Sequence, residues 1–325
     1  MQKARIYQPI KKAYEVYPAN NFAEHSRYSK EERLFVYRYP IAIIFVQKDK
    51  SLQLIYLNLR TARVLQQRII PVAFHEYISP SPILIRQKNE CFILMLTENN
   101  FLSLLSLKTL SITFQWKLPD SPWVRFCYMN DHIIIWEYNS KEVTFWRLFQ
   151  EKSVGDLSLP GLVNESHVQL NNRNVLILQT EQYESLILID VVTKSVLKKI
   201  DTKAHRLITA VNTESFIYIL DDMEMQGVSF CKMYNYRFDE GLELRDERIY
   251  SYSGYCPWFV SLDGGRLVSL TDVRKAFFID FEKEKPVEKF ISRGDEFDAR
   301  RFINYSDKNL VVTVTRENAL WIWKY

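Results

Sequence analysis

Glycine and histidine are scarce in this chain of 325 residues, and the common catalytic motifs are absent. Its 8 glycines are too few for the several close backbone approaches that a phosphate-cradling loop requires. No Gly-x-Ser-x-Gly segment occurs, so the nucleophile elbow of serine hydrolases is missing. The 5 histidines form no metal-ligand pair at helical or strand spacing. We therefore expect no catalytic residues, no metal site and no cofactor, and hence a protein that is not an enzyme.

Cysteine is also sparse, and its placement bears on the cellular compartment. The 4 cysteines contain no Cys-x-x-Cys pair, and three of them fall in apolar strand-like runs, where a free thiol behaves as a small hydrophobe. Residues Met1–Ile10 lack the apolar core of a secretory signal. No apolar run approaches the roughly 18 to 20 residues of a membrane-spanning helix. We expect an intracellular protein, cytoplasmic or nuclear, without a membrane span.

The charges are balanced and mixed along the chain. There are 43 basic and 39 acidic residues, a formal net charge of +4. A dedicated nucleic-acid binder would concentrate basic residues on one stripe or face, which this distribution does not indicate. Hydrophobic residues make up 47% of the chain, enough for a sizeable core. Composition therefore indicates a folded protein that is not a dedicated nucleic-acid binder.

An internal repeat organises the chain. Short apolar runs rich in Ile, Val and Phe recur, and each is followed by a polar turn and a second strand that ends in a large apolar, a polar and a large apolar residue. We call these three residues the triplet. Seven triplets begin 41 to 48 residues apart, about 44 on average, and a period of about 40–45 residues with four strands is typical of a β-propeller. The triplets are Leu57–Leu59, Leu105–Leu107, Trp146–Leu148, Ile189–Val191, Cys231–Met233, Ile279–Phe281 and Trp323–Tyr325.

The repeat predicts an all-β fold, a single seven-bladed β-propeller domain over residues 1–325 with four antiparallel strands in each blade and less than about 10% helix. The last blade lacks a fourth strand before the chain ends. We expect Ala4–Ile10, within the N-terminal segment 1–30, to supply that strand and so remove an exposed sheet edge, the alternative being a loose tail. Lys30–Val36 is either a strand or, behind a capping box, a short helix. Tyr234–Tyr250 is expected to form an extended surface hairpin, and Trp146 and Trp323 to be equivalent buried positions.

The pattern resembles the WD-repeat family over nearly the whole chain. In Ser185–Ile200, Ile189 and Asp190 stand where that family has a Trp-Asp dipeptide, and His167 and His205 stand where its Gly-His histidine often lies. Neither dipeptide occurs in this chain, so the repeats are degenerate. The resemblance implies a scaffold or adaptor subunit of a multiprotein complex.

In a propeller, the loops between blades and the loops between second and third strands open on one face, which by fold analogy binds partners. Trp and Arg dominate interface energetics, and Arg can form paired hydrogen bonds with an acidic or phosphorylated segment. An alternative for Trp123 and Trp258 is packing between blades. The residues expected on the partner-binding face are His75, Trp123, Arg125, His167, Arg206, Trp258, Arg300 and Arg301.

Three other functions stay open at the level of sequence. They are a substrate-recognition propeller of a ubiquitin ligase, a phosphoinositide- or nucleic-acid-binding propeller, and a propeller enzyme. The segment Ala299–Phe302 contains two arginines but lacks the phenylalanine and glycine of the lipid-binding Phe-Arg-Arg-Gly motif. The scaffold is the function we expect.

Overall fold

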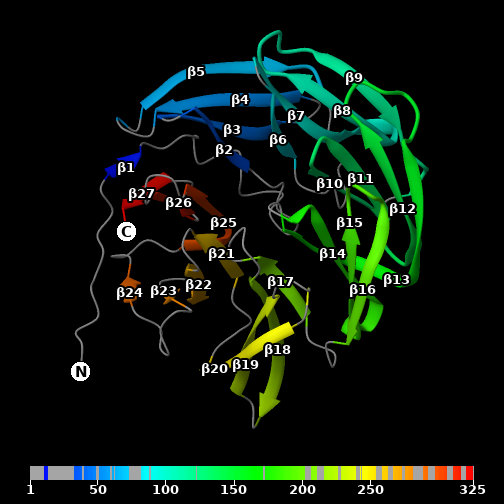
Figure 1. Ribbon diagram of the computed structural model, residues 1–325. Coiled ribbons are helices and arrows are strands. Elements are labelled where there is room, and N and C mark those ends of the chain that lie inside the picture. The colour runs from blue at the N-terminus through cyan, green and yellow to red at the C-terminus, as the bar shows by residue number, and fades with distance from the viewer. Residues whose placement is uncertain are drawn as a thin grey trace. The chain divides into compact units, whose positions relative to one another are not determined.

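The computed structural model consists of antiparallel β-sheets (Figure 1). It describes residues 11–13, 33–38, 40–48, 51–58, 61, 63–72, 82–87, 89–121, 123–170, 173–201, 206–210, 216–225, 228–238, 242, 244–253, 258–262, 266–272, 275–280, 288–291, 297–305, 310–315 and 320–324. Within these residues there is no α-helix, and the named helical elements are two 3-10 turns, Glu98–Asn100 and Glu181–Tyr183. The predicted all-β class with antiparallel sheets is confirmed.

The chain divides into two compact units, and the division falls inside one long strand. One unit is Ala13–Ser158, and the other joins Met1–Lys12 to Leu159–Tyr325. The strand that crosses the boundary is β13 (Gly155–Leu170), which has 16 residues.

The unit Ala13–Ser158 contains two four-stranded sheets and part of a third. Residues Arg33–Arg38 form a strand, so the helical alternative is wrong for the described part of that segment. The first sheet, in spatial order, is β2 (Arg33–Arg38), β3 (Ile41–Lys48), β4 (Ser51–Asn58) and β5 (Arg63–Ile70). The second is β6 (Ile83–Gln87), β7 (Glu90–Thr97), β8 (Phe101–Ser106) and β9 (Ile112–Lys117). The third begins with β10 (Val124–Met129), β11 (His132–Glu137) and β12 (Ser140–Arg147).

The second unit continues the same antiparallel pattern. Strand β13 lies between β12 and β14, so that β10 to β16 form one seven-stranded sheet with β14 (Val175–Thr180), β15 (Ser185–Asp190) and β16 (Ser195–Asp201). The next sheet is β17 (Arg206–Ala210), β18 (Phe216–Met225), β19 (Val228–Phe238) and β20 (Leu244–Ser253). It is followed by β21 (Trp258–Leu262), β22 (Arg266–Asp272), β23 (Lys275–Asp280) and β24 (Glu288–Ile291).

The last sheet combines both ends of the chain. Its order is β1 (Lys11–Ala13), β27 (Leu320–Lys324), β26 (Leu310–Thr315) and β25 (Phe297–Tyr305). The strand beside β27 is thus Lys11–Ala13, whereas the segment expected to pair there, Ala4–Ile10, lies outside the described residues.

In the sheets whose side chains the structure describes, the apolar runs form the inner strands because packing covers both of their faces. All six residues of β14 are buried, and β7 is buried from Phe92 to Thr97. Sheet β2–β5 packs on sheet β6–β9 through a core that includes Ile43, Leu54 and Met95. A second core joins sheet β6–β9 to strands β10–β12 and includes Trp116 and Phe126. Each fully buried aliphatic side chain contributes about 1.5–3 kcal/mol, which is why strands rather than solvated loops form at these runs.

Six of the seven triplets lie at the end of a sheet's third strand. At Asp190 and Ser106, the polar middle residue organises the turn that follows. Asp190 pairs with Val175, the first residue of the strand beside it. The Asp190 carboxylate accepts hydrogen bonds from the backbone N–H groups of Val192 at 2.7 Å and Thr193 at 3.0 Å. Such local bonds are the reason why Asp, Asn and Ser favour turns.

The turn after β8 repeats this geometry with serine in place of aspartate. The Ser106 hydroxyl accepts hydrogen bonds from the N–H groups of Lys108 at 3.2 Å and Thr109 at 3.1 Å. Thr109 and Ser111 then share a hydroxyl hydrogen bond of 2.8 Å, as Thr193 and Ser195 do at the same length. The repeat seen in the sequence is therefore also a repeat of turn chemistry.

The triplet assigned to the fifth repeat is wrong. Cys231–Met233 lies in the middle of β19, where Met233 pairs with Leu220. The residues that pair with the start of β18 are Tyr236 and Arg237, so the triplet there is 236–238. The cause is strand length, because β18 and β19 have 10 and 11 residues and carry the pattern further from the turn. The hairpin predicted for Tyr234–Tyr250 is confirmed as the pairing of β19 with β20.

Candidate functional site

Three connections meet at one end of the strands in the unit Ala13–Ser158. They are the β7–β8, β9–β10 and β11–β12 connections. The backbone N–H of Leu118, after β9, donates to the carbonyl of Asn100 at 2.9 Å. The N–H of Tyr138, after β11, donates to the carbonyl of Trp123 at 3.0 Å. The middle connection is thus tied to both hairpins. We call the surface formed by Asn99, Asn100, Lys117, Asp120, Trp123 and Tyr138 the β9–β10 rim.

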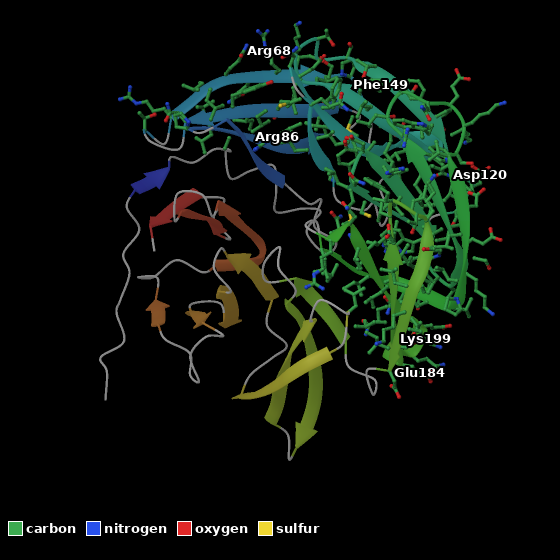
Figure 2. All side chains as sticks on the ribbon, viewed as in Figure 1. Arg68, Arg86, Asp120, Phe149, Glu184 and Lys199 are labelled. Carbon is green, nitrogen blue, oxygen red and sulfur yellow. The ribbon has the colours of Figure 1, made fainter. Side chains whose placement is uncertain are left out.

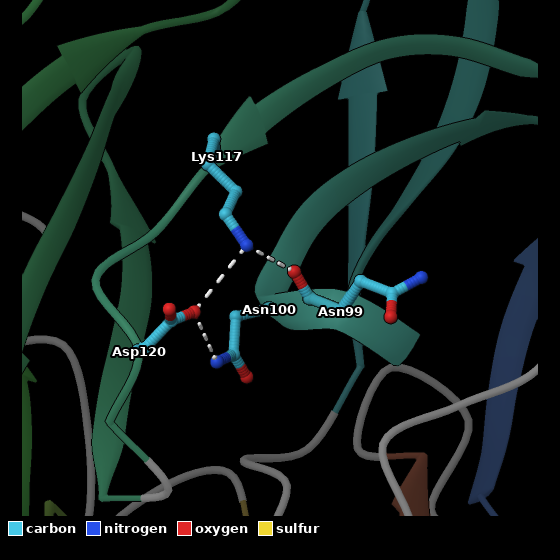
Figure 3. Close-up of polar contacts among 4 residues, drawn as sticks. All are labelled: Asn99, Asn100, Lys117 and Asp120. Atoms are coloured by element: carbon cyan, nitrogen blue, oxygen red, sulfur yellow. Dashed lines mark hydrogen bonds and ion pairs between the residues drawn. The ribbon is translucent and has the colours of Figure 1, made fainter.

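A polar network forms one part of the rim (Figure 3). The Lys117 ammonium donates to the Asn99 carbonyl at 2.6 Å and lies 3.4 Å from a carboxylate oxygen of Asp120. The Asn100 side-chain amide donates to the same carboxylate oxygen at 3.1 Å. Asn99 and Asn100 adopt φ values of 63° and 57°, a left-handed conformation that asparagine tolerates better than most residues. The tight turn after β7 therefore brings these groups to the β9–β10 connection.

The network holds Asp120 in its charged form. Its hydrogen bonds with Asn100 and then with Lys117 hold the pKa of the Asp120 carboxyl below its ordinary value. Both charged side chains are exposed, so solvent screens their attraction and the pair orients the groups more than it stabilises the fold. Lys117 also lies 5.1 Å from the centre of the Phe101 ring. This part of the rim thus presents a fixed carboxylate and a fixed ammonium side by side.

An exposed aromatic pair forms the other part of the rim. The rings of Trp123 and Tyr138 are 5.9 Å apart between centroids and inclined by 42°. The exposed fractions of these residues are 46% and 40%. Trp123 immediately precedes β10, and Tyr138 begins the turn completed by Asn139 at φ 59°. The backbone bond between the two residues holds the rings together on the surface, where they can stack against an apolar or aromatic group.

Of the residues predicted for a partner-binding face, Trp123 lies on the rim. Arg125 is buried, with 8% of its surface exposed, and its guanidinium donates to the Val124 carbonyl at 3.2 Å. His167 is half-buried in β13, opposite Leu178. Trp123 and Arg125 belong to the unit Ala13–Ser158, whereas His167 belongs to the other unit.

The other predicted residues lie in strands whose side chains the structure does not describe, or outside the described residues. Arg206 opens β17 opposite Leu220, and Trp258 opens β21 opposite Leu270. Arg300 and Arg301 lie within β25, at a shift in its register with β26. His75 lies outside the described residues.

Sequence reasoning missed five of the six rim residues. Asn99 and Asn100 follow the buried strand β7, and Tyr138 follows the buried strand β11, so the three share one phase of the repeat. This shared position in the repeat was a signal from which the three residues could have been predicted. Lys117 and Asp120 had none, because their asparagine partners are 18 and 20 positions away and only the folded turn brings them together.

Two kinds of catalytic group, metal clusters and reactive cysteines, were sought among the described residues. They contain no group of three or more His, Cys, Asp or Glu that could hold a metal ion. Cys91 and Cys127 are free thiols, and burial raises the pKa of both, so neither is a reactive thiolate at neutral pH. In the same part of the chain, no helix has the length and apolar character needed to cross a bilayer.

Comparison with known proteins gives a likeness of fold. No protein-family model matches the sequence, and no curated protein matches it. The resemblance to WD repeats therefore stays a prediction. The structure is similar to a chain of hydrazine synthase from Kuenenia stuttgartiensis, with a TM-score of 0.62, 10% sequence identity, and coverage of 88% of this chain and 92% of that one. This neighbour is propeller-like, and because 1005 chains of known structure match, the likeness indicates a widely used architecture.

The expectation that the chain is not an enzyme is contradicted by this likeness. The solved chain that shares its fold belongs to hydrazine synthase, an enzyme. The physical reason is that activity depends on groups placed on a fold, and such groups can converge from several sheets without forming a sequence motif. At 10% identity the likeness concerns the fold alone.

Proposed function

We propose that this chain is an interaction scaffold or adaptor subunit that holds a partner protein on the β9–β10 rim. The observation that carries the proposal is the exposed pair Trp123 and Tyr138, joined by a backbone hydrogen bond. Trp and Tyr are, with Arg, the residue types most enriched among interface hot spots. They offer large contact area with only two side-chain torsions to immobilise. Because the pair is already held in place, little ordering cost remains for binding.

The polar half of the rim determines what kind of partner fits. Lys117 and Asp120 present one charge of each sign, so the rim as a whole is neutral. A partner segment with an apolar or aromatic anchor for Trp123, flanked by one donor and one acceptor, complements this arrangement. Charged groups at the edge of an interface contribute mainly to orientation and to the rate of association.

The proposed architecture is a seven-bladed propeller with four strands in each blade. Five sheets have four strands, and the seven-stranded sheet divides into two blades if β13 serves both. With 16 residues, β13 is long enough to be the last strand of one blade and the first of the next. Averaged electron-microscopy projections of the chain should show seven blades around one axis. Another blade number would contradict the architecture.

The functional test uses Trp123→Ala, Tyr138→Ala and the double variant. Partners bound by the purified wild-type chain are quantified by mass spectrometry, and the dominant one is then titrated directly. A hot-spot truncation costs about 2 kcal/mol or more, so the affinity should fall by about 30-fold or more. Leu197→Ala on β16 is the matched control, because Leu197 is also exposed and lies outside the rim.

The control should bind like wild type, and all variants should melt like wild type because the changed side chains lie on the surface. If the folded double variant keeps its partner at wild-type affinity, the rim is not the binding surface.

A further inference from the structure

Strand β5 is the outermost strand of its sheet and differs from other outermost strands. Every residue from Arg63 to Ile69 is exposed, and only Ile70 is buried. Strands β9 and β16 occupy the same position in their sheets, yet in addition to one buried residue near the end, β9 has two half-buried residues and β16 has three. On β5, Val64, Leu65 and Ile69 are large aliphatic side chains left exposed, Ile69 to 67%.

A β-bulge sorts the side chains of β5 onto two faces. Tyr56 of β4 pairs with Gln66, while the next residue, Leu57, pairs with Val64, so Leu65 is the extra residue. Arg63 lies opposite Asn58 and Arg68 opposite Leu54, and these two positions on β4 are four residues apart. Alternate residues of a strand share a face, so the bulge places both arginines on the same face.

Side-chain contacts agree with this assignment of faces. With the Gln66 side-chain amide turned so that its oxygen faces Arg68, that oxygen accepts from the Arg68 guanidinium on the arginine face. On the opposite face, the Gln53 amide donates to the Gln67 amide oxygen at 3.1 Å. Val64 and Ile69 share that second face, because they lie opposite Leu57 and Gln53. The outer edge is thus cationic on one face and largely aliphatic on the other.

The charge of this edge is not compensated within its own sheet. Strands β2 to β5 contain five basic residues and no Asp or Glu. No ion pair of Arg63 or Arg68 occurs among the described residues. In that same part of the chain no strand pairs with the outer side of β5, and an edge strand offers unpaired N–H and C=O groups in a row. Figure 2 labels Arg68 on this strand.

We infer that β5 accepts an extended acidic segment of a partner protein as an added strand. Backbone hydrogen bonds would supply affinity, and side chains on alternate positions would supply specificity. The arginines are four strand positions apart, about 13 Å, so an antiparallel segment carries acidic residues at i, opposite Arg68, and i+4, opposite Arg63. Its aliphatic residues lie at i−1, opposite Ile69, and at i+3, opposite Val64. A second copy of this chain is a poor occupant, because edge-to-edge pairing of β5 would bring like charges together.

The probe is a labelled synthetic peptide with glutamates at i and i+4 and valines at i−1 and i+3. Its binding to the full chain is measured by fluorescence anisotropy, and amide hydrogen exchange is measured over residues 63–70. Binding should saturate and should slow exchange in this strand. The Arg63→Glu/Arg68→Glu variant should bind at least tenfold more weakly, and a peptide with lysines in place of the glutamates should not bind.

Lys199→Glu on β16 is the matched control, because Lys199 is an exposed cation on another outermost strand (Figure 2). It should bind the peptide like wild type, as should Trp123→Ala, so failure here and failure of the rim are distinguishable. The inference is overturned if the peptide does not bind the wild-type chain, if the control loses as much affinity as the arginine variant, or if binding leaves exchange in β5 unchanged. Self-association of the chain that protects β5 would also overturn it.

Discussion

The indole N–H of Trp116 donates a hydrogen bond of 2.6 Å to the backbone carbonyl of Gln150, a residue 34 positions along the chain. Trp116 lies in β9 and Gln150 follows β12, so the bond joins two neighbouring sheets beside the core that they share. The Trp116 ring also packs against Phe114 and Trp146, with centroids 4.7 and 6.0 Å away.

Trp116→Phe tests this bond. It keeps an aromatic ring in the core but leaves the Gln150 carbonyl without its donor, and we expect a loss of about 1–3 kcal/mol in the free energy of unfolding. Trp116→Ala also opens a cavity and should cost about 3–5 kcal/mol. Urea denaturation measures both. No loss in Trp116→Phe beside a large loss in Trp116→Ala would mean that packing alone, and not the hydrogen bond, holds the two sheets together.

Trp146 should respond in the opposite way to the same change. It is half-buried against the core that contains Trp116, and its indole nitrogen is shielded from solvent without a hydrogen-bond partner among the described residues. Trp146→Phe removes that unsatisfied donor and should cost less than Trp116→Phe, or stabilise the protein. The pair of variants is compared under identical denaturation conditions. A larger loss of unfolding free energy in Trp146→Phe than in Trp116→Phe would contradict the conclusion that the Trp146 indole N–H is an unsatisfied donor.

Asp190→Ala should destabilise the turn between β15 and β16. The side chain accepts two backbone hydrogen bonds there, and their removal should lower the free energy of unfolding by about 1–2 kcal/mol. Asp190→Asn keeps an oxygen acceptor and should lose less than half as much. Ser106→Ala, at the equivalent turn, should resemble Asp190→Ala. Thermal unfolding of the three variants measures these losses. If Asp190→Ala is as stable as wild type, the turn forms without its side-chain acceptor.

We predict that titration of Tyr128 causes a specific loss of stability at alkaline pH. Burial first, and then its hydrogen bond of 2.8 Å to Asp131, raise the pKa of the Tyr128 phenol above its ordinary value of about 10. The folded state therefore retains this proton when the unfolded state has lost it, so its contribution is complete below about pH 10 and declines as the pH rises further. Tyr128→Phe should show a shallower decline of unfolding free energy above pH 10 than wild type. Identical slopes would contradict the prediction.

The local pattern of the sequence was sufficient to predict the strands and most of their turns. Val175–Leu178 and Ile133–Trp136 are buried strands, as their apolar runs indicate, because a continuous apolar run can be covered only inside a sheet packed on both faces. The triplets at Asp190 and Ser106 end strands because short polar side chains bond to the backbone just beyond them.

Only the tertiary structure determined the register of the strands and which distant residues lie close together. The longer strands β18 and β19 moved the fifth triplet to 236–238, and the bulge at Leu65 placed two arginines on one face. Trp123 was predicted on a partner-binding face, with packing between blades as the alternative, but its contact with Tyr138 and the burial of Arg125 were not predicted. Hydrophobic pattern determines which segments become strands, because burial depends on a residue's own chemistry. Which residues then meet depends on hydrogen-bond pairing between distant segments, and a single extra residue in a strand changes the face of every side chain beyond it.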